Sequence, residues 1–578
     1  MVSETNPPSR VLMLIALIQG LALLLLHWSI VLEFWPYESP EWLFAFYSLT
    51  LTWPTMLLLG LTHDNFKRFL LLSSGVALVA FALGFYVGFQ ASPVSHIASH
   101  GLLAGFILTM AIGVFKALNY SQALVAAGPI TYSALFRWSW RNFLTLSQAL
   151  LFTLAVWLVL LLWAGLFASI GIDFILDLFQ KQWFLYPVLA LANGFGVIIF
   201  RRLTHVIDSV TRLQQALMKF LLVLLAPVSA LFLLALCFTG LGALWSSGGS
   251  SLILWMQALM LFFTNAVYQD DPDLRPYGLV LHRFIYVAIA ILPIYSVLSF
   301  YGLSLRVDQY GWTLSRCWAF LIWFVLTVFS VGYLRGIVKF GDDWLHSLGR
   351  VNVIGGLLVM ILVVLVNSPL LDLRKLTLGS QLARLNAGTI DLDNLDVGYI
   401  ARHLGRPGYL ALQTLKDDYG DTNPEFVRRV DFAYQPTSRK RVDAVESYPD
   451  QPAPNKEHFL STLTIISGEP PEKLLAKVYR TELLALNLPN INNDRYYLME
   501  IEVNNLPPTE YLMLRESEDD ASAKLYYWDG KVWRKQVLRF FDDGNNQALF
   551  DAVRNNDIEA VTPHAQDIRI GETYFRVR

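Results

Sequence analysis

Charged residues and cysteines are scarce in this chain. Only 16% of its 578 residues are charged, whereas soluble domains usually contain about a quarter, and 55% are hydrophobic. This composition excludes an ordinary soluble protein and selects the membrane class. The two cysteines, Cys237 and Cys317, lie in or beside apolar runs. We therefore expect no disulfide in the residues after 370, and we expect no nucleic-acid partner.

Apolar runs of about twenty residues recur through the first two thirds of the chain, and this length crosses a bilayer as a helix. Helices are expected because lipid offers no hydrogen-bond partners to the backbone. The sequence therefore predicts an α-helical polytopic membrane protein. Its eleven predicted transmembrane helices lie at 11–32, 42–60, 69–90, 98–116, 146–169, 184–200, 219–243, 251–267, 283–303, 315–335 and 350–368.

Lysine and arginine are unevenly distributed between the two sets of short connections. With the N-terminus inside, the inner connections hold fifteen Lys and Arg and the outer ones hold three, Lys181, Arg306 and Arg316. Because cytoplasmic loops carry the excess of positive residues, the N-terminus is predicted to be cytoplasmic. An odd number of spans then places the C-terminal domain on the outer side of the membrane.

The composition changes near residue 370, which predicts a transmembrane domain at 1–370 and a soluble α+β domain at 371–578. Early in this tail, glycines and a proline break apolar residues spaced as on a helix face, so short helices are expected. A polar stretch at 434–457 is typical of a loop. A helix opening with prolines is expected over 470–486.

Strands are expected in the rest of the tail. Asp529 and Gly530 stand between aromatic runs, which favours a hairpin. The aromatic residues beside this turn either pack a sheet or form a stacking platform for a sugar or peptide, and packing is the commoner use. The strand-like segments are 458–466, 495–503, 510–516, 524–538 and 567–578.

Groups that would reveal a reaction are missing from the sequence. No Asp, Glu, Lys or Arg is placed mid-span by the predicted boundaries, which disfavours an ion-coupled pump. The tail contains no nucleophile elbow, no phosphate-binding glycine loop and no cluster of metal ligands. We therefore predict no cofactor and no metal, and whether the protein is an enzyme stays undecided.

One basic and two acidic segments on the predicted inner side are candidate sites. The stretch 201–215 is basic and amphipathic, which indicates contact with anionic lipid or a phosphate-headgroup site. Acidic clusters at 268–276 and 341–344 are either solvated loops or a divalent-metal site for transferase chemistry. The lipid-headgroup candidates are Arg201, Arg202, His205 and Arg212.

An outer segment, 299–320, carries two arginines against the charge bias. Arg306 can pair with Asp308, and Arg316 can extend to the lipid headgroups. A substrate-binding role is the alternative to this anchoring role. The candidates for a ligand or a structural junction are Arg306, Asp308, Tyr310, Gly311, Thr313 and Arg316.

The same segment resembles a known pattern. Leu305, Arg306, Val307, Tyr310, Gly311, Thr313 and Arg316 match an "LRV-x-x-YG-x-T-x-x-R" motif. The stretches "SQLARLNAG" and "GRPGYLALQTL" in 380–415 are also similar to the bacterial membrane-protein family called domain of unknown function forty-one fifty-three. The resemblance implies a many-span fold in a bacterial inner membrane and implies no activity.

Three functions remain open from the sequence. The first is a non-enzymatic protein whose outer domain contacts envelope components, with membrane lipids and either an envelope protein or a second copy as partners. The second is transport of a lipid or amphipathic solute, and the third is a transferase that uses Asp270, Asp271, Asp342 and Asp343. We also expect Arg306 or Arg316 to pair with an acidic group or with backbone carbonyls of the early tail, around residues 370–400.

Overall fold

The computed structural model divides the chain into two compact units, of which the first comprises 1–391 and 399–414 and the second 392–398 and 415–578. The described residues are 8–94, 96–97, 100–126, 128–240, 250–268, 276–420, 422–434, 463–485, 495–503, 509–516, 521–528, 533–538, 550, 552–555, 568–570 and 573–575.

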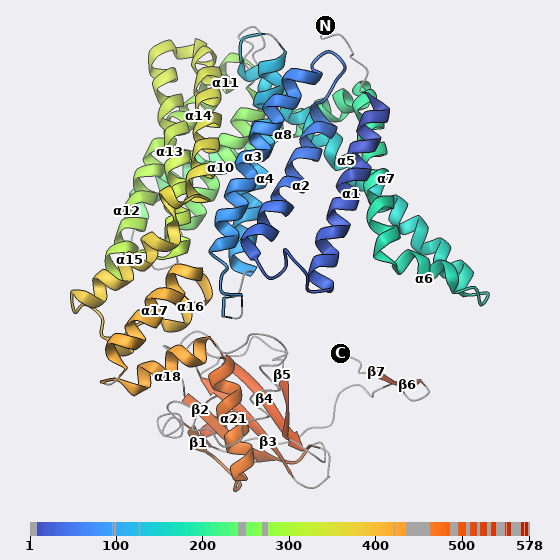
Figure 1. The fold of residues 1–578 in the computed structure, drawn as a ribbon. Helices are drawn as coiled ribbons and strands as arrows, with labels where there is room; N and C mark the ends of the chain where they lie inside the picture. The colour runs from blue at the N-terminus through green and yellow to red at the C-terminus, as the bar shows by residue number, and fades with distance from the viewer. Residues whose placement is uncertain are drawn as a thin grey trace. The chain divides into compact units, whose positions relative to one another are not determined.

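The described residues of the first unit form helices joined by turns and loops, and no strand (Figure 1). Its helices are α1 (Ser9–Val31), α2 (Pro40–Gly60), α3 (Phe66–Phe89), α4 (His100–Val125), α5 (Tyr132–Ala168), α6 (Phe174–Gln180), α7 (Gln182–Arg202), α8 (Thr204–Thr239), α10 (Ser250–Val267), α11 (Leu279–Ala290), α12 (Leu292–Tyr310), α13 (Leu314–Phe340), α14 (Leu345–Val366), α15 (Leu373–Asn386), α16 (Val397–His403) and α17 (Gly405–Tyr419), of which the last two extend into the second unit.

Apart from a few end residues and those outside the described structure, the predicted spans coincide with helices of this unit, so the polytopic helical fold is confirmed. Among the described residues, ten helices are long and apolar enough to cross a membrane, with α11 and α12 counted as one. The predicted span 251–267 lies in α10, which is apolar but shorter. Several helices extend well beyond the predicted ends; α5 has 37 residues, because its polar first turns continue the helix.

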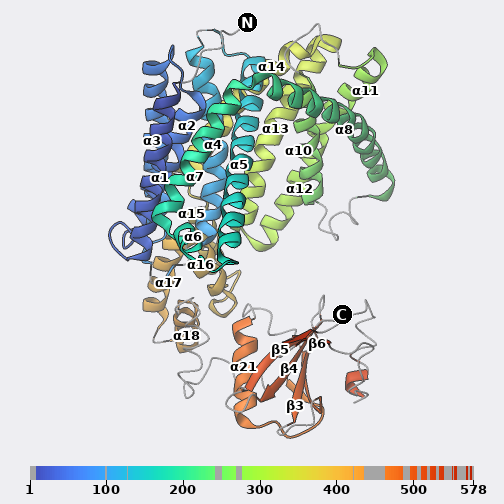
Figure 2. The same ribbon diagram turned by 90° about the vertical axis from the view of Figure 1, so that its right-hand side faces the viewer.

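The helices pack in two groups, each around its own apolar core (Figures 1 and 2). One core joins α1, α2, α3, α4, α5 and α7 around Leu12, Met56 and Phe69. The other joins α8 and α10–α14 around Met260 and Tyr295. Helix α4 packs against both α5 and α14, so the two groups meet along it.

Small residues let α1 and α7 approach closely. A Cβ atom added to Gly20 would lie 2.6 Å from the Cβ of Ala190, and one added to Gly194 would lie 2.5 Å from the Cβ of Ala16. In lipid the hydrophobic effect does not drive helices together, because the lipid tails are as apolar as the helix faces. Helices therefore associate through close packing at such small residues.

The second unit contains a five-stranded sheet in the order β1-β2-β3-β4-β5. Strand β1 is parallel to β2, and the other neighbours are antiparallel. The elements of this unit are α18 (Pro424–Ala433), β1 (Leu463–Ile465), α21 (Glu472–Ala485), β2 (Arg495–Ile501), β3 (Glu510–Glu516), β4 (Ala521–Trp528), β5 (Trp533–Leu538), β6 (Ile568–Ile570) and β7 (Thr573–Phe575).

Both faces of this sheet are covered, because successive side chains of a strand point to opposite sides. Tyr496 and Leu498 pack with Leu474 and Val478 of α21, whereas Tyr497 and Met499 pack with Phe550 on the other face. Tyr526 and Trp533 belong to the core under α21, so sheet packing is the use that the structure gives them.

The sequence reading of the tail is largely confirmed. The expected helix near 470–486 is α21, the expected strands correspond to β1–β5, and β6 pairs with β7 as the last segment predicted. The expected loop at 434–457 and the Asp529-Gly530 turn lie almost wholly outside the described residues. The composition change near 370 marks the end of α14, while the first compact unit continues to 414.

Candidate functional site

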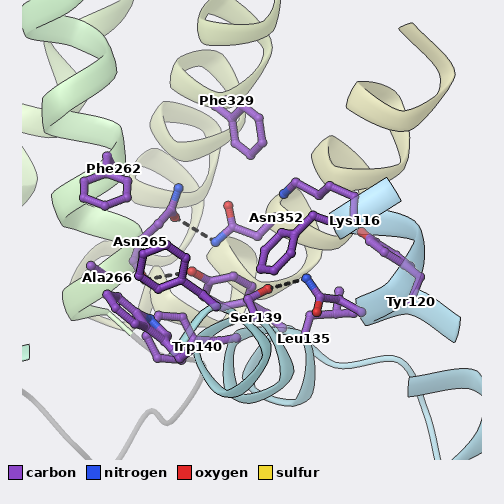
Figure 3. A pocket seen from close by; sticks show the side chains of 15 residues that line it. Lys116, Tyr120, Leu135, Ser139, Trp140, Phe262, Asn265, Ala266, Phe329 and Asn352 are labelled. Carbon is purple, nitrogen blue, oxygen red and sulfur yellow. Dashed lines mark hydrogen bonds between the residues drawn. The ribbon is translucent and has the colours of Figure 1, made fainter. Parts of the chain in front are cut away.

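A cavity of about 420 Å³ lies in the first unit between α4, α5, α10, α13 and α14 (Figure 3). Such a volume is within the range of small-molecule sites, which are mostly apolar with a few polar groups. The walls follow this composition. Its apolar lining is mainly aromatic and includes Phe115, Phe136, Trp140, Phe143, Phe262 and Phe329.

Lys116 supplies the positive charge of the cavity. The predicted span ended at Lys116, but α4 continues to Val125. Lys116, Asn119 and Tyr120 then share one face, since residues three and four apart are neighbours on a helix. All three line the cavity. Lys116, which the predicted boundaries placed at the end of a span, therefore lies inside α4.

One polar wall of the cavity is a hydrogen-bond network between α4 and α5. The Nδ2 group of Asn119 donates to Ser139 Oγ at 2.8 Å. Asn142 donates to Asn119 Oδ1 at 2.7 Å and to Gln122 Oε1 at 2.6 Å. Tyr120 donates to the carbonyl of Val353 at 2.6 Å, which ties α4 to α14. These bonds hold the wall in one arrangement because every buried amide in it has a partner.

The opposite polar wall is formed by α10 and α14. Asn352 Nδ2 donates to Asn265 Oδ1 at 2.9 Å, and the hydroxyl of Tyr333 contacts both amides. Tyr132 donates to the carbonyl of Asn265 at 2.7 Å. Figure 3 shows the Lys116 side chain extending from α4 toward the side of the cavity where Asn352 and Phe329 lie.

The rim of the cavity lies on the surface of the helical body. Phe143 of α5 and Phe262 of α10 line the cavity and are 51% and 52% exposed. Both helices belong to the apolar body, where exposed rings face lipid. The cavity therefore reaches the surface of the helical body beside these two rings.

The family-like segment 304–316, most of which the predicted spans leave as a connection at 304–314, is mostly helical. Helix α12 continues to Tyr310, and Gly311 ends it with a φ of +73°, a conformation that favours glycine. Thr313 caps α13 by accepting the Arg316 backbone N–H at 3.4 Å. The exposed Arg306 and Asp308 form no ion pair with each other in the described structure, because residues two apart on a helix do not face each other.

This turn, 309–314, contacts α15 and α16 within the first unit. Gln381 donates to the carbonyl of Trp312 at 3.0 Å, and Arg384 donates to that of Gln309 at 3.1 Å. In return the backbone N–H of Trp312 donates to Ser380 Oγ at 3.0 Å. The backbone N–H of Leu314 also donates to the hydroxyl of Tyr399 at 2.7 Å. We call these four contacts the junction.

The donors at the junction are not the ones predicted. Arg316 donates to the carbonyl of Gly311 at 2.8 Å and lies over the ring of Tyr310. Neither it nor Arg306 hydrogen-bonds to 365–420 among the described residues, so the predicted arginine bond is wrong. The tail side chains donate instead because the end of α12 leaves free backbone carbonyls. A Cβ atom at Gly311 would lie 2.9 Å from Arg384, so glycine also makes room for this contact.

Two further contacts of the early tail were not predicted from the sequence. Arg374 makes a bidentate ion pair with Asp372, at 2.7 and 3.0 Å, and Tyr86 of α3 donates to the same carboxylate at 2.7 Å. At the start of α17, the backbone N–H of Arg406 donates to the carbonyl of Gln90 at 2.9 Å. The signal for the ion pair is a lone Asp-x-Arg directly after the last apolar run.

The four lipid-headgroup candidates are placed differently from one another. Arg201 is buried and donates to the carbonyls of Leu58 and Leu61 at 2.7 and 2.8 Å, where a cation offsets the negative end of α2. Its guanidinium therefore stabilises the C-terminal end of α2. The exposed Arg202 and Arg212 donate to serine hydroxyls. The side chain of His205 lies outside the described structure.

The acidic clusters gain little support as a metal site. Asp342 accepts two hydrogen bonds from Arg283, at 3.2 and 2.8 Å, at an exposed position. Asp270 and Asp271 lie outside the described residues. Within the residues that the structure describes, no group of three or more His, Cys, Asp or Glu side chains is arranged to hold a metal ion.

The residues that line the cavity and those that form the junction all lie in the part of the chain that matches a known protein family. Neither curated proteins nor solved structures give a match to this chain. A family model described as Domain of unknown function (DUF4153) matches residues 11–415, which is more than half of the 578 residues and stops before the sheet of the second unit. The chain therefore belongs to the family Domain of unknown function (DUF4153), as its motifs indicated.

Proposed function

We propose that the membrane body binds a lipid or another amphipathic solute in the cavity and carries it between the two sides of the membrane. The observation that carries this proposal is the cavity itself, with an aromatic lining, two polar walls and a rim on the lipid-facing surface. Specific sites for small molecules combine these features. Scaffolding alone gives no reason for such a cavity.

Filling the cavity tests this function. Ala266 lines it and is buried, so Ala266→Phe places a ring in the cavity and leaves both polar walls in place. We expect the intact protein, purified in mild detergent, to retain at least one amphiphile in native mass spectrometry, and the variant to lose most of it. The control is Leu158→Phe, at an exposed position of α5. Equal retention by Ala266→Phe and the unmodified protein would contradict the proposal.

We also propose that this protein lies in a bacterial inner membrane with its N-terminus in the cytoplasm and its second unit in the periplasm. The excess of Lys and Arg on one set of connections supports this orientation. In a background of Cys237→Ser and Cys317→Ser, an impermeant maleimide should label Ser169→Cys and Glu469→Cys in intact spheroplasts. It should label Asp64→Cys only after permeabilisation, and the opposite pattern would reverse the orientation.

A second candidate function rests on the second unit. It is a compact unit with a sheet covered on both faces, and the family match ends before this sheet. Such a unit is suited to contact another envelope protein or a second copy. Cross-linking the intact protein in its native membrane should capture one of these, and only uncross-linked monomer would count against this role.

A further inference from the structure

The charges of the cavity are unbalanced. Its fifteen lining residues include one cation, Lys116, and no Asp, Glu, Arg or His. In the structure as described, Lys116 makes no hydrogen bond or ion pair, although its side chain is partly buried. An ammonium group removed from water and left without a counter-ion is costly, and charged side chains inside membrane proteins usually have a partner.

We propose that the missing partner belongs to the ligand, so that the cavity selects an amphiphile with an anionic head group, a phosphate or a carboxylate. This inference rests on the proposed function, since it names the chemical class that the same cavity takes. A charge-assisted hydrogen bond from the Lys116 ammonium is the strongest contact that the lining offers an anion. The Asn352 amide has a second N–H beyond the one it donates to Asn265.

The level of the cavity along the helices fits a head group. Phe136 and Trp140 lie in the first third of α5, Asn265 lies two residues before the end of α10, and Asn352 lies in the first half of α14. The cavity is thus near one end of the helical body. A head group at this level stays close to the interface, and its apolar chain can leave along Phe143 and Phe262 into lipid.

The competing source of the same charge is a free inorganic anion. The lining argues for the amphiphile, because most of its side chains are rings and a hydrated anion gains nothing from them. The experiment must therefore separate the charge from the chain. Three probes do this: dodecyl phosphate, dodecanol and inorganic phosphate.

Binding of these probes to the intact protein, purified in a neutral detergent, tests the inference. We expect dodecyl phosphate to bind at least tenfold more tightly than dodecanol, and inorganic phosphate neither to bind nor to compete. Lys116→Met should weaken dodecyl phosphate at least tenfold and leave dodecanol unchanged, whereas Lys116→Arg should keep the preference. Lys339→Met, which removes an exposed lysine of α13 outside the cavity, is the matched control and should change nothing.

The outcomes separate the inference from the proposed function. Equal affinities for dodecyl phosphate and dodecanol, or an unchanged preference in Lys116→Met, would overturn anion selection and leave the amphiphile site standing. Binding of inorganic phosphate as tight as that of dodecyl phosphate would identify a free-anion site and overturn the inference. Binding of none of the probes would remove the proposed function as well. Elution of each variant as the same folded species excludes misfolding as the cause.

Discussion

Replacing Asp372 by Ala should destabilise the first unit by about 3–5 kcal/mol, the usual cost of removing one partner from a buried ion pair. Only 1% of the Asp372 side chain and 8% of the Arg374 side chain are exposed. The carboxylate accepts the Arg374 side chain, the Arg374 backbone N–H and the Tyr86 hydroxyl. Its removal leaves the guanidinium buried without a counter-ion. Thermal unfolding of the intact protein in detergent measures the effect.

A second pair in the same unit provides the control for this prediction. Asp342 pairs with Arg283 in a similar bidentate geometry but at an exposed position, where an ion pair contributes about 0–1 kcal/mol. Asp342→Ala should therefore change stability little. Removing both buried charges, with Asp372→Ala and Arg374→Met together, should recover part of the loss. Equal effects of Asp372→Ala and Asp342→Ala would contradict the role given to the buried pair.

Replacing Gly20 by Leu should separate α1 from α7 and destabilise the protein by about 3 kcal/mol, at the upper end of overpacking effects. The new Cβ would lie 2.6 Å from the Cβ of Ala190 and 3.2 Å from the Cα of Pro187. Backbone atoms cannot move aside without shifting a helix. The yield of folded protein and its unfolding temperature in detergent measure the outcome.

Gly75 offers a matched control, because no atom lies within 4 Å of a Cβ added there. Gly75→Leu makes the same chemical change in a helix and should leave stability within about 1 kcal/mol of the unmodified protein. A swap supplies a second check: Gly20→Ala should be destabilising alone and less so when combined with Ala190→Gly. A Gly20→Leu protein as stable as Gly75→Leu would show that the close α1–α7 contact is unnecessary.

The polytopic fold was predictable because lipid forces the backbone into long apolar helices. The sheet of the second unit was predictable for a similar reason: alternating residues such as Tyr496 and Tyr497 show the period of a strand with both faces covered. The positions of the helix ends were not predictable from the sequence. Lys116, Asn119 and Tyr120 read as a connection, whereas the neighbouring α5 and α14 give Asn119 and Tyr120 hydrogen-bond partners inside the body.

The cavity was therefore not predictable from the sequence. Its residues come from five helices, and no local pattern shows that Lys116, Asn265 and Asn352 line one space. The junction was predictable as a contact between 309–314 and the early tail, but its donors were not. Hydrogen-bond direction depends on which carbonyls the end of α12 leaves unsatisfied, and the sequence alone does not reveal this.

The measurement that tests the central claim most directly is a cryo-electron microscopy map of the intact protein, purified with its native lipids. The account predicts elongated non-protein density in the cavity between α4, α5 and α10, with its polar end in hydrogen-bond contact with Lys116 Nζ. The density should continue past Phe143 and Phe262 into the surrounding lipid. A cavity that holds only water, or that side chains close completely, would contradict the claim.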